Sequence, residues 1–383
     1  MVGPMPKPTE VRRPMGPRVV VAVGCVVFCV TGGTQAMAQE SPGWDTQAAA
    51  AYLDTRLDWW MDWPPAARDR GTFCVSCHTA VPYALARPAL RVGAARPSPG
   101  TIEERLLRNV ETRVKAWRDI EPFYSDQERQ APKTKESRGS EAILNALILA
   151  NRDAHTGEMG DVTRQAFDNL WALQATSGPS SGAWPWLNFG LQPWEVPASQ
   201  YYGAALAALA VGRAPGDYPA TVAVQSELNA LRSYLRRELP AQNLFNRLTV
   251  LWAAGGWPVL LDSQQRHAIV SDAFQRQRSD GGWGLASLGT FERRDGTPLA
   301  DESDGYATGL VALAMRAAEV ADDPRLEHGL GWLRRHQESD GSWSASSLNR
   351  AHDPQSNRGR FMRDAATAYA VLALTDDIHR NRR

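Results

Sequence analysis

The sequence predicts an all-α protein that is built from six pairs of helices. Polar, amphipathic segments with helical periodicity alternate along the chain with segments rich in Ala, Leu, Val, Gly and Tyr. A turn pattern recurs late in the chain at a fixed offset, and no stretch has the period-2 alternation that is typical of strands. These observations favour stacked helical units.

The recurring turn reads Gln-x-Ser-Asp-Gly-x-Trp. It occupies 277–283 and returns at 337–343, an offset of 60 residues at every position. Ser-Asp-Gly is turn chemistry, because Asp bonds its own backbone and Gly permits positive φ. A repeat longer than about 20 residues predicts stacked supersecondary units.

The helices can be placed in order. The first, polar members of the pairs are expected near 45–61, 101–118, 162–174, 222–239, 265–277 and 325–337. The second, apolar members are expected near 79–91, 139–151, 199–211, 243–254, 304–318 and 364–375. Asp323 and Pro324 are an expected N-cap and first helical residue. Helices that are apolar on nearly every side are buried, so an outer ring of polar helices should surround an inner apolar ring.

The pentapeptide Cys74-Val75-Ser76-Cys77-His78 lies between the two helices of the first pair. Cys-x-x-Cys-His is the attachment signal for a c-type haem: each thiol forms a thioether, and the imidazole of His78 ligates the iron. A disulfide in an exported protein is the main alternative. A thioredoxin-like pair needs a βαβ context, and a structural zinc site needs four ligands.

The N-terminal residues 1–38 have the pattern of a removable export leader. A basic start precedes an uncharged apolar run at 19–33, and Ala36-Met37-Ala38 supplies the small-x-small cleavage pattern. Cys25 and Cys29 lie in this run, so the mature chain would keep only Cys74 and Cys77. We expect a periplasmic or secreted protein with one domain at 39–383 and its haem loop at about 62–80.

The charge balance excludes one class of partner. The chain has 42 Lys and Arg, 42 Asp and Glu, and a formal net charge of +0. Such a balance predicts no nucleic-acid surface. No segment after the leader is long and apolar enough to span a bilayer, although contact with a membrane surface stays open.

The segment Gly329-Leu330-Gly331-Trp332-Leu333-Arg334-Arg335-His336-Gln337, with Gly341-Ser342-Trp343, resembles the QW repeat of squalene and oxidosqualene cyclases. Related repeats occur in the β subunits of protein prenyltransferases. A second copy ends at Trp283, and Gln174, Gly182 and Trp184 form a third with an insertion. The resemblance covers most of 45–375. It implies a closed α6/α6 toroid with a central apolar cavity, in which the Gln and Trp of each repeat stack and fix neighbouring outer helices.

The same resemblance raises the question of catalysis. Terpene cyclases of this superfamily protonate an alkene with an Asp-x-Asp-Asp motif. The nearest match here is Asp301-Glu302-Ser303-Asp304, which lacks the paired aspartates. Asp301 and Asp304 are therefore weak catalytic candidates, and Ser303 or Asp304 is also an expected helix cap. The zinc site of prenyltransferases needs a Cys that the mature chain does not have.

The second axial ligand of the iron and the partners of the haem propionates are expected on the same rim of the toroid as the haem loop. If the ring closes, the loop of the sixth pair, near 344–363, neighbours the haem loop. It contains Met362 and His352, which we rank first and second as axial ligand, ahead of Met61 at the end of the first outer helix. Arg358 and Arg360 are expected to pair with propionates.

We therefore expect an exported c-type haem protein that transfers electrons or senses redox state, with a redox protein as partner and possible coupling to an apolar small molecule in the cavity. One alternative is an isoprenoid cyclase or transferase whose Cys pair is structural. A further alternative is a binding scaffold.

Overall fold

The computed structural model describes residues 3, 43–91, 98–129, 132–320 and 322–375. The chain divides into two units, Met1–Glu40 and Ser41–Arg383, and everything below concerns the second. The expected leader, with Cys25 and Cys29, lies outside the described residues apart from Gly3. Within the described ranges, no helix is long and apolar enough to cross a membrane.

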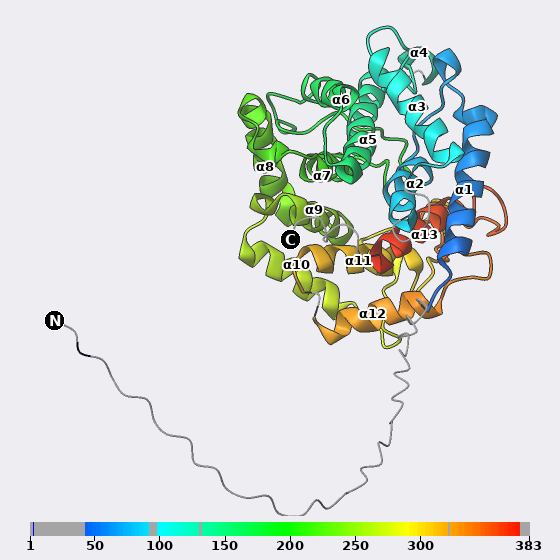
Figure 1. Ribbon diagram of the computed structural model, residues 1–383. Helices are drawn as coiled ribbons and strands as arrows, with labels where there is room; N and C mark the ends of the chain where they lie inside the picture. The colour runs from blue at the N-terminus through cyan, green and yellow to red at the C-terminus, as the bar shows by residue number, and fades with distance from the viewer. Residues whose placement is uncertain (1–2, 4–42, 92–97, 130–131, 321, 376–383) are drawn as a thin grey trace, which may run out of the picture. The chain divides into compact units, whose positions relative to one another are not determined.

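The expected helix pairs are confirmed, and the described residues contain no β-strand, only two isolated bridges. Figure 1 labels the helices. The polar members are α1 (Thr46–Asp62), α3 (Thr101–Lys115), α6 (Asp161–Trp171), α8 (Gln225–Glu238), α10 (Ser263–Gln275) and α12 (Pro324–Arg335). The apolar members are α2 (Ala80–Ala86), α5 (Lys133–Thr156), α7 (Ser199–Arg213), α9 (Leu244–Gly256), α11 (Gly305–Ala317) and α13 (Phe361–Leu374). One short helix, α4 (Asp126–Arg129), was not expected.

The apolar helices form a closed series of contacts. Going round, α2 contacts α5, and α5, α7, α9, α11 and α13 each contact the next, until α13 contacts α2. The polar helices lie against this series: α6, α8, α10, α12 and α1 contact α5, α7, α9, α11 and α13, respectively. Most residues of the apolar helices are buried, and burial of this apolar surface stabilises the arrangement.

The three Gln-Gly-Trp turns make equivalent hydrogen bonds. The Gln side-chain amide donates to the Gly carbonyl of its own turn and to a backbone carbonyl at the start of the next polar helix. The acceptors at the next helix are Glu227 for Gln174, Arg325 for Gln277, and Asp45 for Gln337, at 3.0, 2.7 and 2.8 Å. The Trp ring N–H donates to a carbonyl in the preceding polar helix, at Leu170, Ala273 or Leu333. Gln337 therefore joins the last helix pair to the first.

Each of these turns requires glycine at one position because of the backbone conformation there. Gly182, Gly281 and Gly341 have φ of +94°, +96° and +86°, in the left-handed region that favours glycine. At Gly341, a Cβ atom would lie 2.2 Å from the backbone of Ala48 in α1. The turn thus brings its backbone directly against the next polar helix.

Several helix boundaries differ from expectation by a few residues, and two of them have a clear physical reason. Helix α5 begins at Lys133, six residues before the expected start at 139, because polar residues in its first turns are buried with partners. Ser137, for example, is completely buried and accepts from the backbone N–H of Tyr124 at 3.1 Å. Helix α2 ends at Ala86 and continues as a 3₁₀ turn over Arg87–Arg91, where Pro88 cannot donate a backbone hydrogen bond.

Both expected caps at the C-terminal pairs are confirmed. Asp323 accepts from the backbone N of Arg325, and Pro324 is the first residue of α12. Asp304, rather than Ser303, caps α11 by accepting from the backbone N of Ala307.

Candidate functional site

The loop between α1 and α2 holds the Cys-x-x-Cys-His segment in a defined conformation. The ring N–H of Trp60 donates to the carbonyl of Cys74 at 2.8 Å, and the N–H of Cys74 donates to the carbonyl of Ala66 at 2.8 Å. Asn109 on α3 bonds both the N–H and the carbonyl of Phe73. Because the backbone is tied to α1 and α3, the directions of the two thiols are set by the fold.

Cys74 and Cys77 are unpaired thiols in this structure, so the disulfide considered above is absent from it. Burial raises the pKa of the Cys74 thiol to about 11 and the pKa of Cys77 well above its ordinary value. Both groups are therefore protonated at neutral pH. Thiolate is the reactive form of Cys, so burial lowers the reactivity of both thiols at neutral pH.

The two thiols line a cavity of about 50 Å³. Its wall includes the aromatic rings of Trp60, Phe123, Tyr124 and Trp186, together with His78 and the carboxyl group of Glu195. Burial raises the pKa of Glu195 to about 7. Glu195, which sequence reasoning missed, places a partly protonated acid beside the thiols at neutral pH.

His78 is held among aromatic rings. Its imidazole stacks on the ring of Phe361 with centroids 3.8 Å apart, and the ring of Trp60 meets it edge-on at 4.8 Å. Burial, aided by the nearby charge of Arg56, lowers the pKa of His78 to about 3. The imidazole is therefore neutral, the form in which histidine binds metals.

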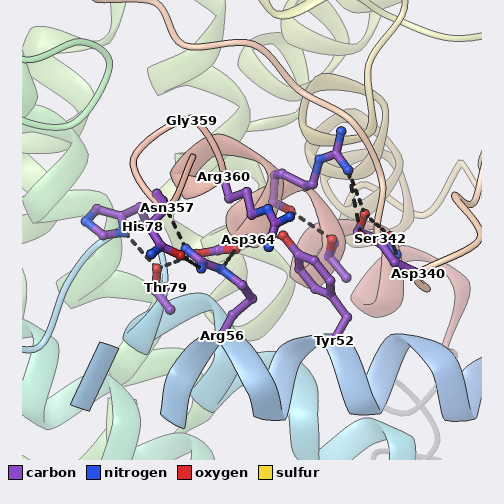
Figure 2. A network of polar contacts seen from close by, with 12 residues as sticks. Tyr52, Arg56, His78, Thr79, Asp340, Ser342, Asn357, Gly359, Arg360 and Asp364 are labelled. Carbon is purple, nitrogen blue, oxygen red and sulfur yellow. Dashed lines mark hydrogen bonds and ion pairs between the residues drawn. The ribbon is translucent and has the colours of Figure 1, made fainter. Parts of the chain in front are cut away.

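A polar network ties His78 to α13 (Figure 2). The Nδ1 of His78 lies 2.8 Å from the Oγ1 of Thr79, and that hydroxyl donates to Oδ2 of Asp364 at 2.7 Å. Arg56 donates to both carboxylate oxygens of Asp364, at 2.7 and 3.0 Å, and the hydroxyl of Tyr52 donates to Oδ1 at 2.9 Å. The network joins α1, the residue that precedes α2, and α13.

Sequence reasoning missed Thr79, Arg56 and Asp364. One signal was available for Asp364, because an acidic residue in an otherwise apolar, buried helix needs a partner. Nothing in the sequence identified that partner: Arg56 is 308 positions away.

The donor set fits a c-type haem. Two unpaired thiols lie in one wall, and His78 follows them directly with one ring nitrogen already bonded to the protein. A cavity of about 50 Å³ has room for little more than a water molecule. A porphyrin ring therefore fits only if side chains beside the loop move.

Four of the five other residues predicted to contact the haem lie within 344–363, the loop of the sixth pair, and Met61 lies on α1. This loop approaches the haem segment, because Asn357 accepts from Arg56 at 2.8 Å and Phe361 stacks on His78. Met362 is buried at the start of α13, Met61 is buried in α1, and His352 is exposed beside a different cavity. Arg358 is exposed, and Arg360 donates to the side chain of Gln355.

A second cavity, of about 320 Å³, contains Asp304 at the start of α11. The carboxyl group accepts from the backbone N–H of Ala307 at 2.8 Å and of Leu285 at 2.6 Å, and burial raises its pKa to about 7. The lining includes charged side chains, among them Arg293 and Arg363. Asp301 is in solvent, paired with Arg278 at 3.1 Å, and does not line this cavity. The structure thus keeps the two candidate acids apart.

Comparison with known proteins supports part of the resemblance. The family model for the squalene-hopene cyclase C-terminal domain matches residues 221–375. No curated protein matches the chain. The matched range contains Asp304 and Asp364 and does not include the Cys-x-x-Cys-His segment at 74–78, which precedes it in the chain. Over residues 221–375, this all-helical chain is therefore similar to the squalene-hopene cyclase C-terminal domain.

Proposed function

We propose that this chain is an exported c-type haem protein, in which a closed α6/α6 toroid holds one haem for electron transfer or redox sensing. The observation that carries the proposal is the joint placement of two unpaired thiols and a neutral, directionally bonded imidazole in one segment. The attached haem supplies a one-electron ferric–ferrous couple.

The residues of the chain have separate parts in this proposal. Cys74 and Cys77 each add a thiol across one vinyl group, so that an S–C bond forms and the thiol proton goes to the neighbouring vinyl carbon. His78 offers a neutral ring nitrogen, and the aromatic walls exclude water. Met362, His352 and Met61 remain our ranked candidates for the second axial position, with Arg358 and Arg360 for the propionates.

The location and partners follow from the same proposal. The leader pattern at 1–38 directs the protein to the periplasm, where covalent haem attachment takes place in bacteria. A periplasmic redox protein is then the exchange partner. An apolar small molecule bound inside the toroid is a further part of this proposal.

The test is covalent haem. The protein should be coexpressed with cytochrome c maturation factors, separated by denaturing electrophoresis, stained for haem peroxidase activity, and quantified as the pyridine haemochrome. We expect one haem per chain, and loss of most of the stain in Cys74→Ala or Cys77→Ala. Ser347→Ala, a small change in the other cavity, is the control and should keep the full signal. An unstained wild-type band refutes the proposal.

A second candidate is an isoprenoid cyclase, favoured by the family match over 221–375 and by Asp304. Asp304, with its pKa near 7, could give its proton to an alkene carbon and leave a carbocation that closes a ring and ends by losing a proton. The charged lining of the cavity and the backbone bonds to both carboxyl oxygens count against it. Turnover of squalene by the wild type, abolished in Asp304→Asn, would place this candidate first.

A further inference from the structure

We infer that Thr79 and Asp364 are positioning residues for His78: they hold its ring as the tautomer with hydrogen on Nδ1, which leaves Nε2 as the iron ligand. This inference rests on the proposed haem function, and it adds the residues that orient the ligand and tune the couple.

The first step is to establish whether Asp364 donates or accepts in its hydrogen bond with Thr79. Arg56 has only donors, and it donates to both carboxylate oxygens, through Nε to Oδ1 and through Nη2 to Oδ2. A carboxyl group that receives a guanidinium on both oxygens acts as an ionised acceptor. Both oxygens of Asp364 therefore act as acceptors, and the hydrogen in its contact with Thr79 comes from the hydroxyl group.

The second step follows from the single hydrogen of a hydroxyl group. Thr79 gives that hydrogen to Oδ2 of Asp364 at 2.7 Å. The only role left to its oxygen toward His78, at 2.8 Å, is that of acceptor. The hydrogen between the two side chains must therefore lie on Nδ1 of His78, as Figure 2 allows the reader to follow.

The third step concerns orientation. Phe361 stacks on one face of the imidazole and Trp60 meets it edge-on, while Thr79 bonds one nitrogen. These three contacts fix both the plane and the rotation of the ring. Nε2 is then the nitrogen with a free lone pair, as a ligand requires.

The last step is the effect of this hydrogen bond on the ferric–ferrous redox couple. A metal-bound imidazole whose N–H bonds to an acceptor is more basic and donates more strongly to the metal. Thr79 is a strong acceptor because its own hydrogen is drawn toward a carboxylate. The relay should therefore favour ferric over ferrous iron, and its loss should raise the midpoint potential.

The test uses Thr79→Val, which removes the hydroxyl group and keeps the shape, and Thr79→Ser, which keeps the hydroxyl group. Thr163→Val is the matched control, because it breaks another buried Thr–Asp hydrogen bond, to Asp153, away from the site. In the holoprotein, Thr79→Val should shift the ferric–ferrous ratio toward ferrous iron and so raise the midpoint potential; a tenfold shift in that ratio corresponds to 59 mV for one electron. Thr79→Ser and Thr163→Val should leave the potential unchanged, and an unchanged potential in Thr79→Val overturns the inference.

A second measurement does not need haem. The chain has seven His, and ¹H–¹⁵N correlation spectra of their rings, in the full chain made without haem-attachment factors, report each tautomer. His78, assigned by its absence in His78→Gln, should carry its hydrogen on Nδ1 in the wild type and in Thr79→Ser, and should lose this preference in Thr79→Val. Hydrogen on Nε2 in the wild type overturns the inference. If the wild type attaches no haem, the proposed function fails, and these spectra still decide the tautomer.

Discussion

Replacing Trp343 by Ala tests whether the Gln-Gly-Trp turn is a structural unit. The side chain is completely buried, and its ring N–H donates to the carbonyl of Leu333 at 2.8 Å. Its ring also packs edge-on against Trp44, with centroids 5.7 Å apart. Loss of a buried Trp side chain costs about 3–5 kcal/mol of unfolding free energy, and the lost hydrogen bond adds about 1 kcal/mol.

The assay is chemical denaturation followed by far-ultraviolet circular dichroism, which does not depend on the replaced chromophore. Trp343→Phe keeps a six-membered aromatic ring but loses the N–H donor and part of the buried indole, so it should cost less than Trp343→Ala, about 1–3 kcal/mol. Trp283→Ala should cost as much as Trp343→Ala, because Trp283 is equally buried and bonds Ala273 in the same way. Trp117→Ala, at a half-buried position, is the control and should cost clearly less. If Trp343→Ala unfolds at the same denaturant concentration as the wild type, the turn does not hold the helices together and the reasoning is wrong.

Three further predictions concern ring closure, pH and the axial ligand. Gln337→Ala should lower the free energy of unfolding by about 1–2 kcal/mol, as should Gln277→Ala, and equal stability of the wild type and both variants would contradict the role of the amide; urea titration measures this. Because burial raises the folded-state pKa of Asp304 to about 7, stability that is present below about pH 4 should be lost as the pH rises toward 7. Asp304→Asn should lack this loss, so denaturation at pH 5 and 8 should show a smaller difference for the variant than for the wild type; equal differences contradict the assignment. In the ferric holoprotein, methionine ligation gives a weak band near the red edge of the spectrum, which Met362→Ala should abolish. If the band is absent from the wild type or survives the substitution, His352→Ala is the next variant to record.

Helix positions could be predicted because the signals are local. The cap at Asp323, the following Pro324 and the turn at 337–343 each lie within a few residues of the boundary that they define. The start of α5 at Lys133 could not be predicted, because polar residues of its first turns are buried by tertiary contacts: Ser137, for example, accepts from the backbone N–H of Tyr124. A polar residue in an inner helix appears to be a boundary until its partner is known.

The residues of the candidate site also divide into those that local sequence identifies and those that only folding brings there. Cys74, Cys77 and His78 form one continuous segment, and so the sequence alone was enough to single them out as candidates for haem attachment. Glu195 came to the same cavity only through folding, as one carboxyl group among many in the sequence.

By itself, the sequence determined the all-α class, the order of the helix pairs, the repeated turn and the haem-type segment, because each is encoded by residues close together in the chain. Only the tertiary structure decided that α13 contacts α1 and α2, and that Asp364 therefore meets Arg56 and Thr79, 308 and 285 positions away. The physical reason is that these partners are selected by the packing of whole helices. A hydrogen bond between distant residues forms only after the apolar faces of the helices have brought the two side chains together.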